Sequence, residues 1–133
     1  MLRFQFTPNR YIRSKWTNRT FYVWVSLNGI RRQLIFDTGS SYIGLLQDVI
    51  DRLGLQPTNR TVEIVTADSK VIGIRRPIYT ISTVEAFGFT AHDVEAVAID
   101  LPPNCGFVGT LGVSFLKHLV FTVNFEEGWI EIN

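Results

Sequence analysis

The sequence contains few of the residues that cross-link small proteins or bind metals. Among its 133 residues are one cysteine, Cys105, and two histidines, His92 and His118. A single cysteine excludes a disulfide within the chain and a cysteine-based zinc site, and neither histidine has a partner at metal-ligand spacing. A chain of this length can bury about two-thirds of its unfolded surface. We therefore expect one domain that folds without a disulfide or a metal.

Long hydrophobic runs are also missing. No apolar run approaches the roughly 20 residues of a membrane-spanning helix, and residues 1–6 lack the apolar core of a signal peptide. We therefore expect a cytoplasmic protein with no membrane partner. Apolar residues make up 46% of the chain and the net charge is only +1. This composition excludes disorder as the main state and excludes a polycation that binds nucleic acid with its whole surface.

The charges are nonetheless distributed unevenly along the chain. Residues 1–36 contain seven basic and no acidic side chains, whereas residues 77–133 contain seven acidic side chains and one basic side chain. The basic segment could bind phosphate or an acidic partner, or it could neutralise the acidic part of the chain. Because the total is so nearly balanced, neutralisation is the favoured interpretation and no nucleic-acid partner is expected.

Runs of aromatic and β-branched residues predict mainly short β-strands. Strands at 20–27 and 30–36 should form a hairpin across Asn28-Gly29, a strong turn signal. The other expected elements are a hairpin over 61–74 with its turn near 67–70, strands at 78–84, 86–90 and 94–99, short helices over 45–53 and within 111–119, and a last hairpin formed by 120–125 and 129–132. Together they indicate an all-β domain, mainly β with one or two short helices, built as a compact barrel.

A loop of small residues, Asp37-Thr38-Gly39-Ser40, follows the first hairpin. By itself it would be an ordinary turn. Its flanks are strongly apolar, so we expect the Asp37 carboxyl group to be partly desolvated. Gly39 allows a tight turn and close approach to a ligand, and the hydroxyl groups of Thr38 and Ser40 can orient the loop. The apolar segment 107–116, which contains two glycines, is suited to pack closely against it.

At these residues the chain resembles the retropepsin-like aspartic proteases. Asp37-Thr38-Gly39-Ser40 looks like the active-site signature of that family, and Leu111-Gly112 followed by 114–116 looks like its second marker. Residues 66–71 resemble the flap, and 120–132 resemble the C-terminal hairpin. The resemblance implies a closed, acid-protease-like β-barrel over 20–133, preceded by a basic N-terminal extension over 1–19.

The resemblance also implies an enzyme, a homodimeric aspartic endopeptidase. The chemistry requires two carboxyl groups that share one proton, because two neighbouring carboxylates cannot both ionise cheaply. The chain has one Asp-Thr-Gly, so the Asp37 residues of two subunits would have to meet on a two-fold axis. A water molecule activated between them would attack the peptide bond. No metal and no organic cofactor are needed.

Further roles follow from the resemblance. Thr38 would hydrogen-bond across the two-fold axis, Gly39 would let backbone amides orient the carboxylates, and Ser40 would hydrogen-bond the outer carboxyl oxygen. An extended peptide would lie beneath the flap, and the C-terminal hairpin would supply much of the dimer interface. The residues expected to contact substrate are Ala67, Asp68, Ser69, Leu111 and Gly112, and the aromatic residues expected at the interface are Phe121, Phe125 and Trp129.

Two departures from the family pattern keep alternatives open. Thr110 stands where a branched aliphatic residue is commoner, and Ser69 stands where the flap usually has glycine. The first alternative is therefore a non-catalytic peptide-binding or dimerisation module on the same fold. A weaker one is a nucleic-acid binder that acts through the basic N-terminal segment. Residues 1–19 could also be a propeptide that the enzyme removes from itself.

Overall fold

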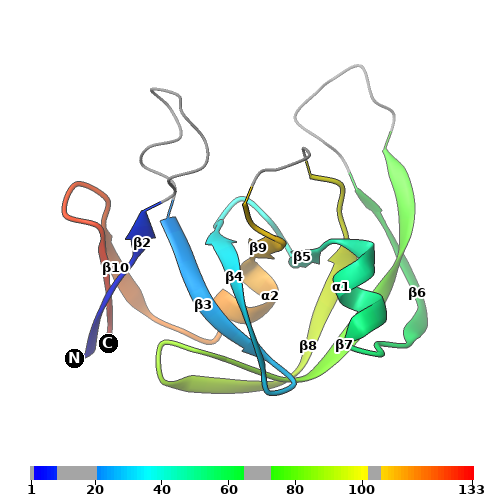
Figure 1. The fold of residues 1–133 in the computed structure, drawn as a ribbon, viewed down its shortest axis with the longest axis horizontal. Coiled ribbons are helices and arrows are strands. Elements are labelled where there is room, and N and C mark those ends of the chain that lie inside the picture. Colours follow the sequence, from blue (N-terminus) through cyan, green and yellow to red (C-terminus); the bar gives the residue numbers. More distant parts are fainter. Residues whose placement is uncertain (1, 9–20, 65–72, 102–105) are drawn as a thin grey trace.

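A computed structural model describes residues 2–8, 21–64, 73–101 and 106–133, and Figure 1 shows how they fold. As predicted, the chain is mostly β with two short helices. The elements are β1 (Leu2–Gln5), β2 (Thr7–Pro8), β3 (Phe21–Leu27), β4 (Ile30–Phe36), β5 (Ile43–Leu45), α1 (Gln47–Arg52), β6 (Pro57–Ile64), β7 (Ile74–Ala86), β8 (Phe89–Ala98), β9 (Gly109–Leu111), α2 (Val113–Leu116), β10 (Phe121–Asn124) and β11 (Trp129–Ile132). Neither helix has the length and hydropathy needed to cross a membrane, and the described residues contain no other helix.

The larger sheet closes into a barrel. Its strand order is β2-β3-β4-β9-β5-β8-β7-β6, and an additional pairing between β3 and β7 closes a ring of six strands. The inward-facing side chains of this ring form the core, in which Val25, Leu34, Ile43 and Ile81 are completely buried. Closure leaves the ring without the free strand edges that open sheets expose. The predicted fold class, a closed acid-protease-like barrel, is confirmed.

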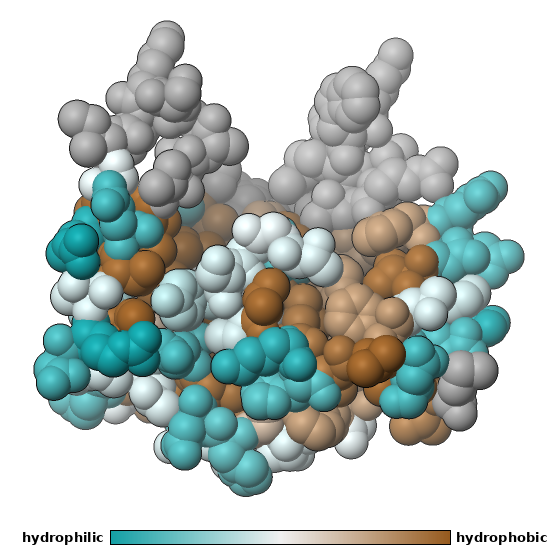
Figure 2. Space-filling view, turned by 180° about the vertical axis from the view of Figure 1, so that it is seen from behind, coloured by the Kyte–Doolittle hydropathy of each residue, from teal (hydrophilic) through white to brown (hydrophobic). Residues whose placement is uncertain are grey.

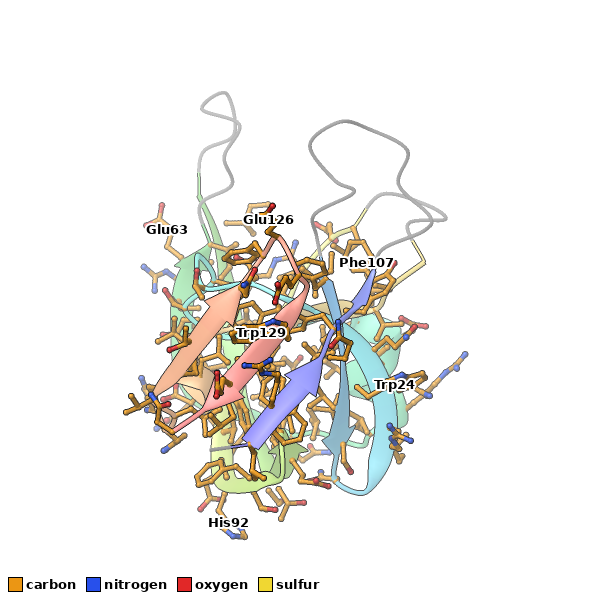
Figure 3. All side chains as sticks on the ribbon, turned by 90° about the vertical axis from the view of Figure 1, so that its left-hand side faces the viewer. Trp24, Glu63, His92, Phe107, Glu126 and Trp129 are labelled. Carbon is orange, nitrogen blue, oxygen red and sulfur yellow. The ribbon has the colours of Figure 1, made fainter. Side chains whose placement is uncertain are left out.

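A second, three-stranded sheet carries both ends of the chain. Its order is β1-β11-β10, so β11 lies between the other two strands (Figure 3). Residues 2–8, which fall in the segment predicted as an N-terminal extension, thus pair with the C-terminal strand and with β3. Arg3 forms an ion pair with Glu131, with 3.4 Å between Nη2 and Oε2. For this arginine, the contact supports the interpretation that the basic segment neutralises the acidic one.

The first predicted hairpin is confirmed, and the first helix begins later than expected. Asn28 and Gly29 both have positive φ, 49° and 85°, as a two-residue turn of type I′ requires. Residues 43–45 form β5 because they pair with β8 and β9, which leaves α1 only residues 47–52. The helix ends before Gly54, whose φ of 66° suits the residue that follows a helix.

The predicted strand at 86–90 was wrong. The chain turns there, because Phe87 and Gly88 have φ of 56° and 71° and join β7 to β8. A phenylalanine rarely adopts positive φ. The Phe87 ring is buried, with its centroid 5.6 Å from that of Phe4 and 6.4 Å from that of Phe6. Tertiary packing therefore stabilises a turn that the local sequence does not signal. The predicted turn at 67–70 lies outside the described residues.

Exposed apolar side chains are scattered over the surface. Figure 2 shows several separate apolar areas among hydrophilic side chains on the back of the molecule. Val120 and Phe125, next to β10, are 70% and 53% exposed. Single exposed apolar residues are normal on soluble proteins. Their distribution alone does not identify a partner surface.

Phe6 is expected to stabilise the fold, because it connects the N-terminal segment to the barrel core. Its ring stacks on that of Phe21 with 5.0 Å between the ring centroids, and its centroid lies 5.2 Å from that of the Phe36 ring. Replacing a buried phenylalanine by alanine removes these contacts and leaves a cavity. We predict that Phe6→Ala lowers the free energy of unfolding by about 3–5 kcal/mol in urea titration. Leu2→Ala, at a site that is 60% exposed, should change it by less than about 0.5 kcal/mol. Equal effects of the two variants would contradict this assignment.

Candidate active site

Asp37 lies where β4 ends beside β9. The two strands run parallel, with Phe36 opposite Leu111, and the Asp37 backbone N–H donates to the Leu111 carbonyl oxygen at 3.1 Å. The side chain is half-buried, as expected from its apolar flanks. The Gly39 N–H donates to Asp37 Oδ1 at 2.9 Å. Among the described residues, Oδ2 has no hydrogen-bond partner, so one carboxyl oxygen is oriented and the other is available for chemistry.

The second predicted marker packs directly against this loop. The N–H groups of Val113 and Ser114 donate to the carbonyl oxygens of Ser40 and Ser41, at 2.8 and 2.9 Å. A Cβ atom on Gly112 would lie 2.1 Å from the Tyr42 carbonyl oxygen, so this close approach requires glycine. The sequence therefore identified the two segments that the fold brings together.

Leu111 and Gly112 support the loop from behind. The Leu111 side chain is completely buried, and Gly112 is buried as well. Both residues were predicted to contact substrate, yet neither lines the groove in front of Asp37. A motif shows that two segments meet but not which side of the contact faces solvent, so the sequence could not distinguish a supporting role from a binding one.

The other predicted site residues take different positions. The Ser40 Oγ donates to the Tyr42 carbonyl oxygen at 2.9 Å. Because a hydroxyl group has one proton, Ser40 does not also donate to the Asp37 carboxylate, which corrects that expectation. Thr38 and Gly39 are exposed at the tip of the loop. Three further predicted site residues, Ala67, Asp68 and Ser69, lie outside the described residues.

Sequence reasoning missed the role of Ser114. Its hydroxyl accepts a hydrogen bond from the Ile43 N–H at 2.9 Å and donates to the Glu95 carbonyl oxygen at 2.8 Å. It is the buried polar residue of the described core. One side chain thus connects α2, β5 and β8 beneath the Asp37 loop. The only sequence signal was a serine inside an apolar run that directly follows Gly112.

A groove of about 640 Å³ lies in front of Asp37. Its walls are the Asp37 loop, the facing ends of β6 and β7, the end of β8 and Thr110 of β9; in Figure 1 the loop follows β4 and β6 lies at the right. The volume is within the range of ligand-binding clefts. Its lining residues are Asp37, Gly39, Ser40, Ser41, Tyr42, Val62, Glu63, Ile64, Ile74, Arg76, Val97, Ala98, Ile99, Asp100 and Thr110.

The groove is bordered by three carboxylate side chains, those of Asp37, Glu63 and Asp100, but the described residues offer no metal-ligand set. No group of three His, Cys, Asp or Glu side chains among the described residues could hold a metal ion. A carboxyl group can serve as a general base or, when protonated, as an acid and hydrogen-bond donor. The arrangement is suited to acid–base chemistry on a ligand that lies along the groove.

Comparisons with known proteins agree with this geometry. Residues 23–115 match the family model described as aspartyl protease. Among solved structures, a retropepsin-like aspartic protease from Rickettsia conorii superposes with a TM-score of 0.67 over 98% of this chain and 89% of that chain. The two sequences are 19% identical, so this likeness concerns the fold. No curated protein matches the sequence.

Ser114 is expected to stabilise the site through its two hydrogen bonds. In Ser114→Ala, the Ile43 N–H and the Glu95 carbonyl oxygen would lose their partner in a buried place. We predict a decrease of about 1–3 kcal/mol in the free energy of unfolding, measured by urea titration. Ser41→Ala is the matched control, because that side chain is exposed and its hydroxyl forms no hydrogen bond with the described residues. A Ser114→Ala protein as stable as the control would refute this role.

Proposed function

The chain belongs to the retropepsin-like aspartyl protease family, and on that basis we propose that it is an aspartic endopeptidase that works as a homodimer. The observation that carries the proposal is the position and hydrogen bonding of the Asp37 carboxyl group. Its carboxyl group borders the groove, with one oxygen held by the Gly39 N–H and the other without a partner among the described residues. A peptide in an extended conformation could lie along that groove.

The reaction requires a second carboxyl group from a loop like that of Asp37, and the described residues contain no second loop of this kind. The aspartates at 48 and 51 lie on α1, and Asp93 lies on β8. Asp100 also lines the groove, but it pairs with Arg76 and follows no Asp-Thr-Gly-like loop. A symmetric dimer would bring a second Asp37 to the same place, so that the two residues share one proton.

In the proposed mechanism, the ionised Asp37 of one subunit accepts a proton from a water molecule. The water oxygen attacks the carbonyl carbon of the peptide bond, while the protonated Asp37 of the other subunit donates a hydrogen bond to the carbonyl oxygen. The tetrahedral intermediate then collapses. The C–N bond breaks, the amine takes up a proton, and the dyad returns to its singly protonated state.

The exposed tip of the Asp37 loop supports a dimer built at this point. Thr38 and Gly39 lie at this tip, where a second copy could contact them. Within the three-stranded sheet β11 is already paired on both edges, so β10 is the strand of the C-terminal hairpin that could still pair with a second subunit. Strand pairing between subunits would have to use β1 or β10, whose outer edges are unpaired within the described residues.

Two of the aromatic residues expected at the interface also pack within the subunit. Phe121 packs on Phe36 and Phe125 stacks on Phe21, with centroids 5.7 and 6.0 Å apart, so both rings contribute to packing within the subunit. Trp129 lies on β11. The Arg3 guanidinium group lies over its ring, with Cζ 3.9 Å from the ring centroid. We retain Trp129 as a candidate for an interface and add Arg3, which contacts its ring. The cytoplasmic location stays a prediction of the sequence.

Loss of the Asp37 carboxylate should abolish peptide cleavage. We predict that wild type cleaves a diverse mixture of unstructured peptides somewhere between acidic and neutral pH. Asp37→Asn should lower the rate by at least about a hundredfold, because the amide cannot accept the proton from water. Asp48→Asn, on the remote helix α1, is the control and should keep full activity. Mass spectrometry of the products gives the readout. Binding of peptides without cleavage under any condition would instead favour the non-catalytic module.

Mixing wild-type and Asp37→Asn subunits tests whether the site needs two copies of Asp37. After subunit exchange at equal concentrations, about one quarter of the dimers would carry two aspartates. Activity per total protein should then fall to about a quarter of the wild-type value. A fall to one half would mean that each subunit works alone. Sedimentation velocity on the same mixtures should show the dimer directly, and a strict monomer at high concentration would contradict the proposal.

A further inference from the structure

One wall of the groove is made by the facing ends of β6 and β7, and alternate residues of these strands line it. Val62 pairs with Arg76 and Ile64 with Ile74 in the antiparallel register. Side chains alternate along a strand, so these four residues share one face. All four line the groove. Of these four side chains three are apolar and one, Arg76, is a cation, and the carboxylate of Glu63 also borders the groove.

The intervening residues, Glu63 and Arg75, belong to the opposite face. They pair with each other in the register, and Figure 3 shows the Glu63 side chain projecting away from the body of the molecule. Arg75 Nη1 donates to Thr61 Oγ1 at 3.0 Å, on the same outer face. The hairpin thus carries two adjacent arginines with opposite orientations. Of these, only Arg76 lines the groove.

Arg76 forms an ion pair with Asp100, whose side chain is largely exposed to water. Its Nη2 lies 2.7 Å from Asp100 Oδ2, and the side-chain exposures are 22% for Arg76 and 85% for Asp100. An ion pair with one partner so open to water contributes little free energy. A guanidinium group has five N–H donors, and the described residues accept one hydrogen bond from it. Arg76 is the cation among the described groove-lining residues.

We propose that Arg76 is a specificity-determining residue that binds a glutamate or aspartate side chain of the substrate. The inference rests on the proposed protease function. A carboxylate can form two parallel hydrogen bonds with a guanidinium group, and these are stronger than bonds between neutral groups. Asp100 would turn into solvent when the substrate carboxylate takes its place.

The neighbouring side chains extend the prediction to a short sequence pattern. Ile74 and Arg76 are two residues apart on one face of β7. The side chains of an extended substrate also alternate in direction with a period of two residues, so every second one faces this wall. The preferred substrate would therefore carry an acidic residue and, two positions from it, an aliphatic one.

Paired peptides that differ only by glutamate or glutamine at one position test this proposal. We expect wild type to cleave the glutamate member with at least about tenfold higher kcat/KM at the position that reaches Arg76. Arg76→Gln should remove the preference, and Arg76→Lys should keep part of it because the charge remains. Arg75→Gln is the matched control and should preserve it. Asp100→Asn should strengthen it, because the competing carboxylate is gone.

The outcomes separate this inference from the proposed function. Cleavage of both peptides with equal kcat/KM at every position would overturn the role of Arg76 and leave the protease assignment intact. If no peptide is cleaved, fluorescence anisotropy of labelled peptides bound to Asp37→Asn gives the second readout. Tighter binding of the glutamate peptide, lost on adding Arg76→Gln, would support the inference. Equal binding of the two peptides would refute it.

Discussion

The contact between the Asp37 loop and the start of α2 is the constraint on which the site depends. Two backbone hydrogen bonds join residues 113 and 114 to the carbonyl oxygens of Ser40 and Ser41, and the approach is so close that Gly112 admits no side chain. The parallel pairing of β4 with β9 sets up this contact. The orientation of Asp37 is therefore a property of the barrel, because it follows from strand pairing between segments distant in the sequence.

The same geometry fits the proposed function, in which one subunit would supply half of a catalytic site. The barrel closes through the pairing of β3 with β7. The described residues contain one loop of the Asp37 type, which follows β4. The carboxyl group on that loop has one oxygen fixed by the Gly39 N–H and one with no hydrogen-bond partner in the part of the chain that the structure describes. A single carboxyl group cannot act as base and hydrogen-bond donor in the same step. In the proposed dimer, a second copy would complete the chemistry without any change in the fold.

Much of the fold and of the candidate site could be predicted from short sequence patterns. The predictions that failed share one cause, which is packing between segments far apart in the sequence. Asn28-Gly29 predicted its hairpin, and Asp37 with Leu111-Gly112 predicted the two segments that meet. The turn at Phe87 was missed because its positive φ is stabilised by aromatic rings from β1 and beyond. The pairing of β1 with β11 joins residues more than 120 positions apart. Packing at such distances leaves no trace in a short window of sequence.

In the proposed function, catalysis and specificity would use different parts of the structure. The Asp37 loop is held by backbone hydrogen bonds and by the close approach of Gly112, where an added side chain would displace the loop. The wall made by β6 and β7 is formed by side chains on alternating positions of these strands. There a substitution changes what the groove recognises while the ladder of backbone hydrogen bonds stays the same. Arg76 is placed where a charge can select a substrate, because its partner Asp100 is almost fully solvated and gives way at little cost.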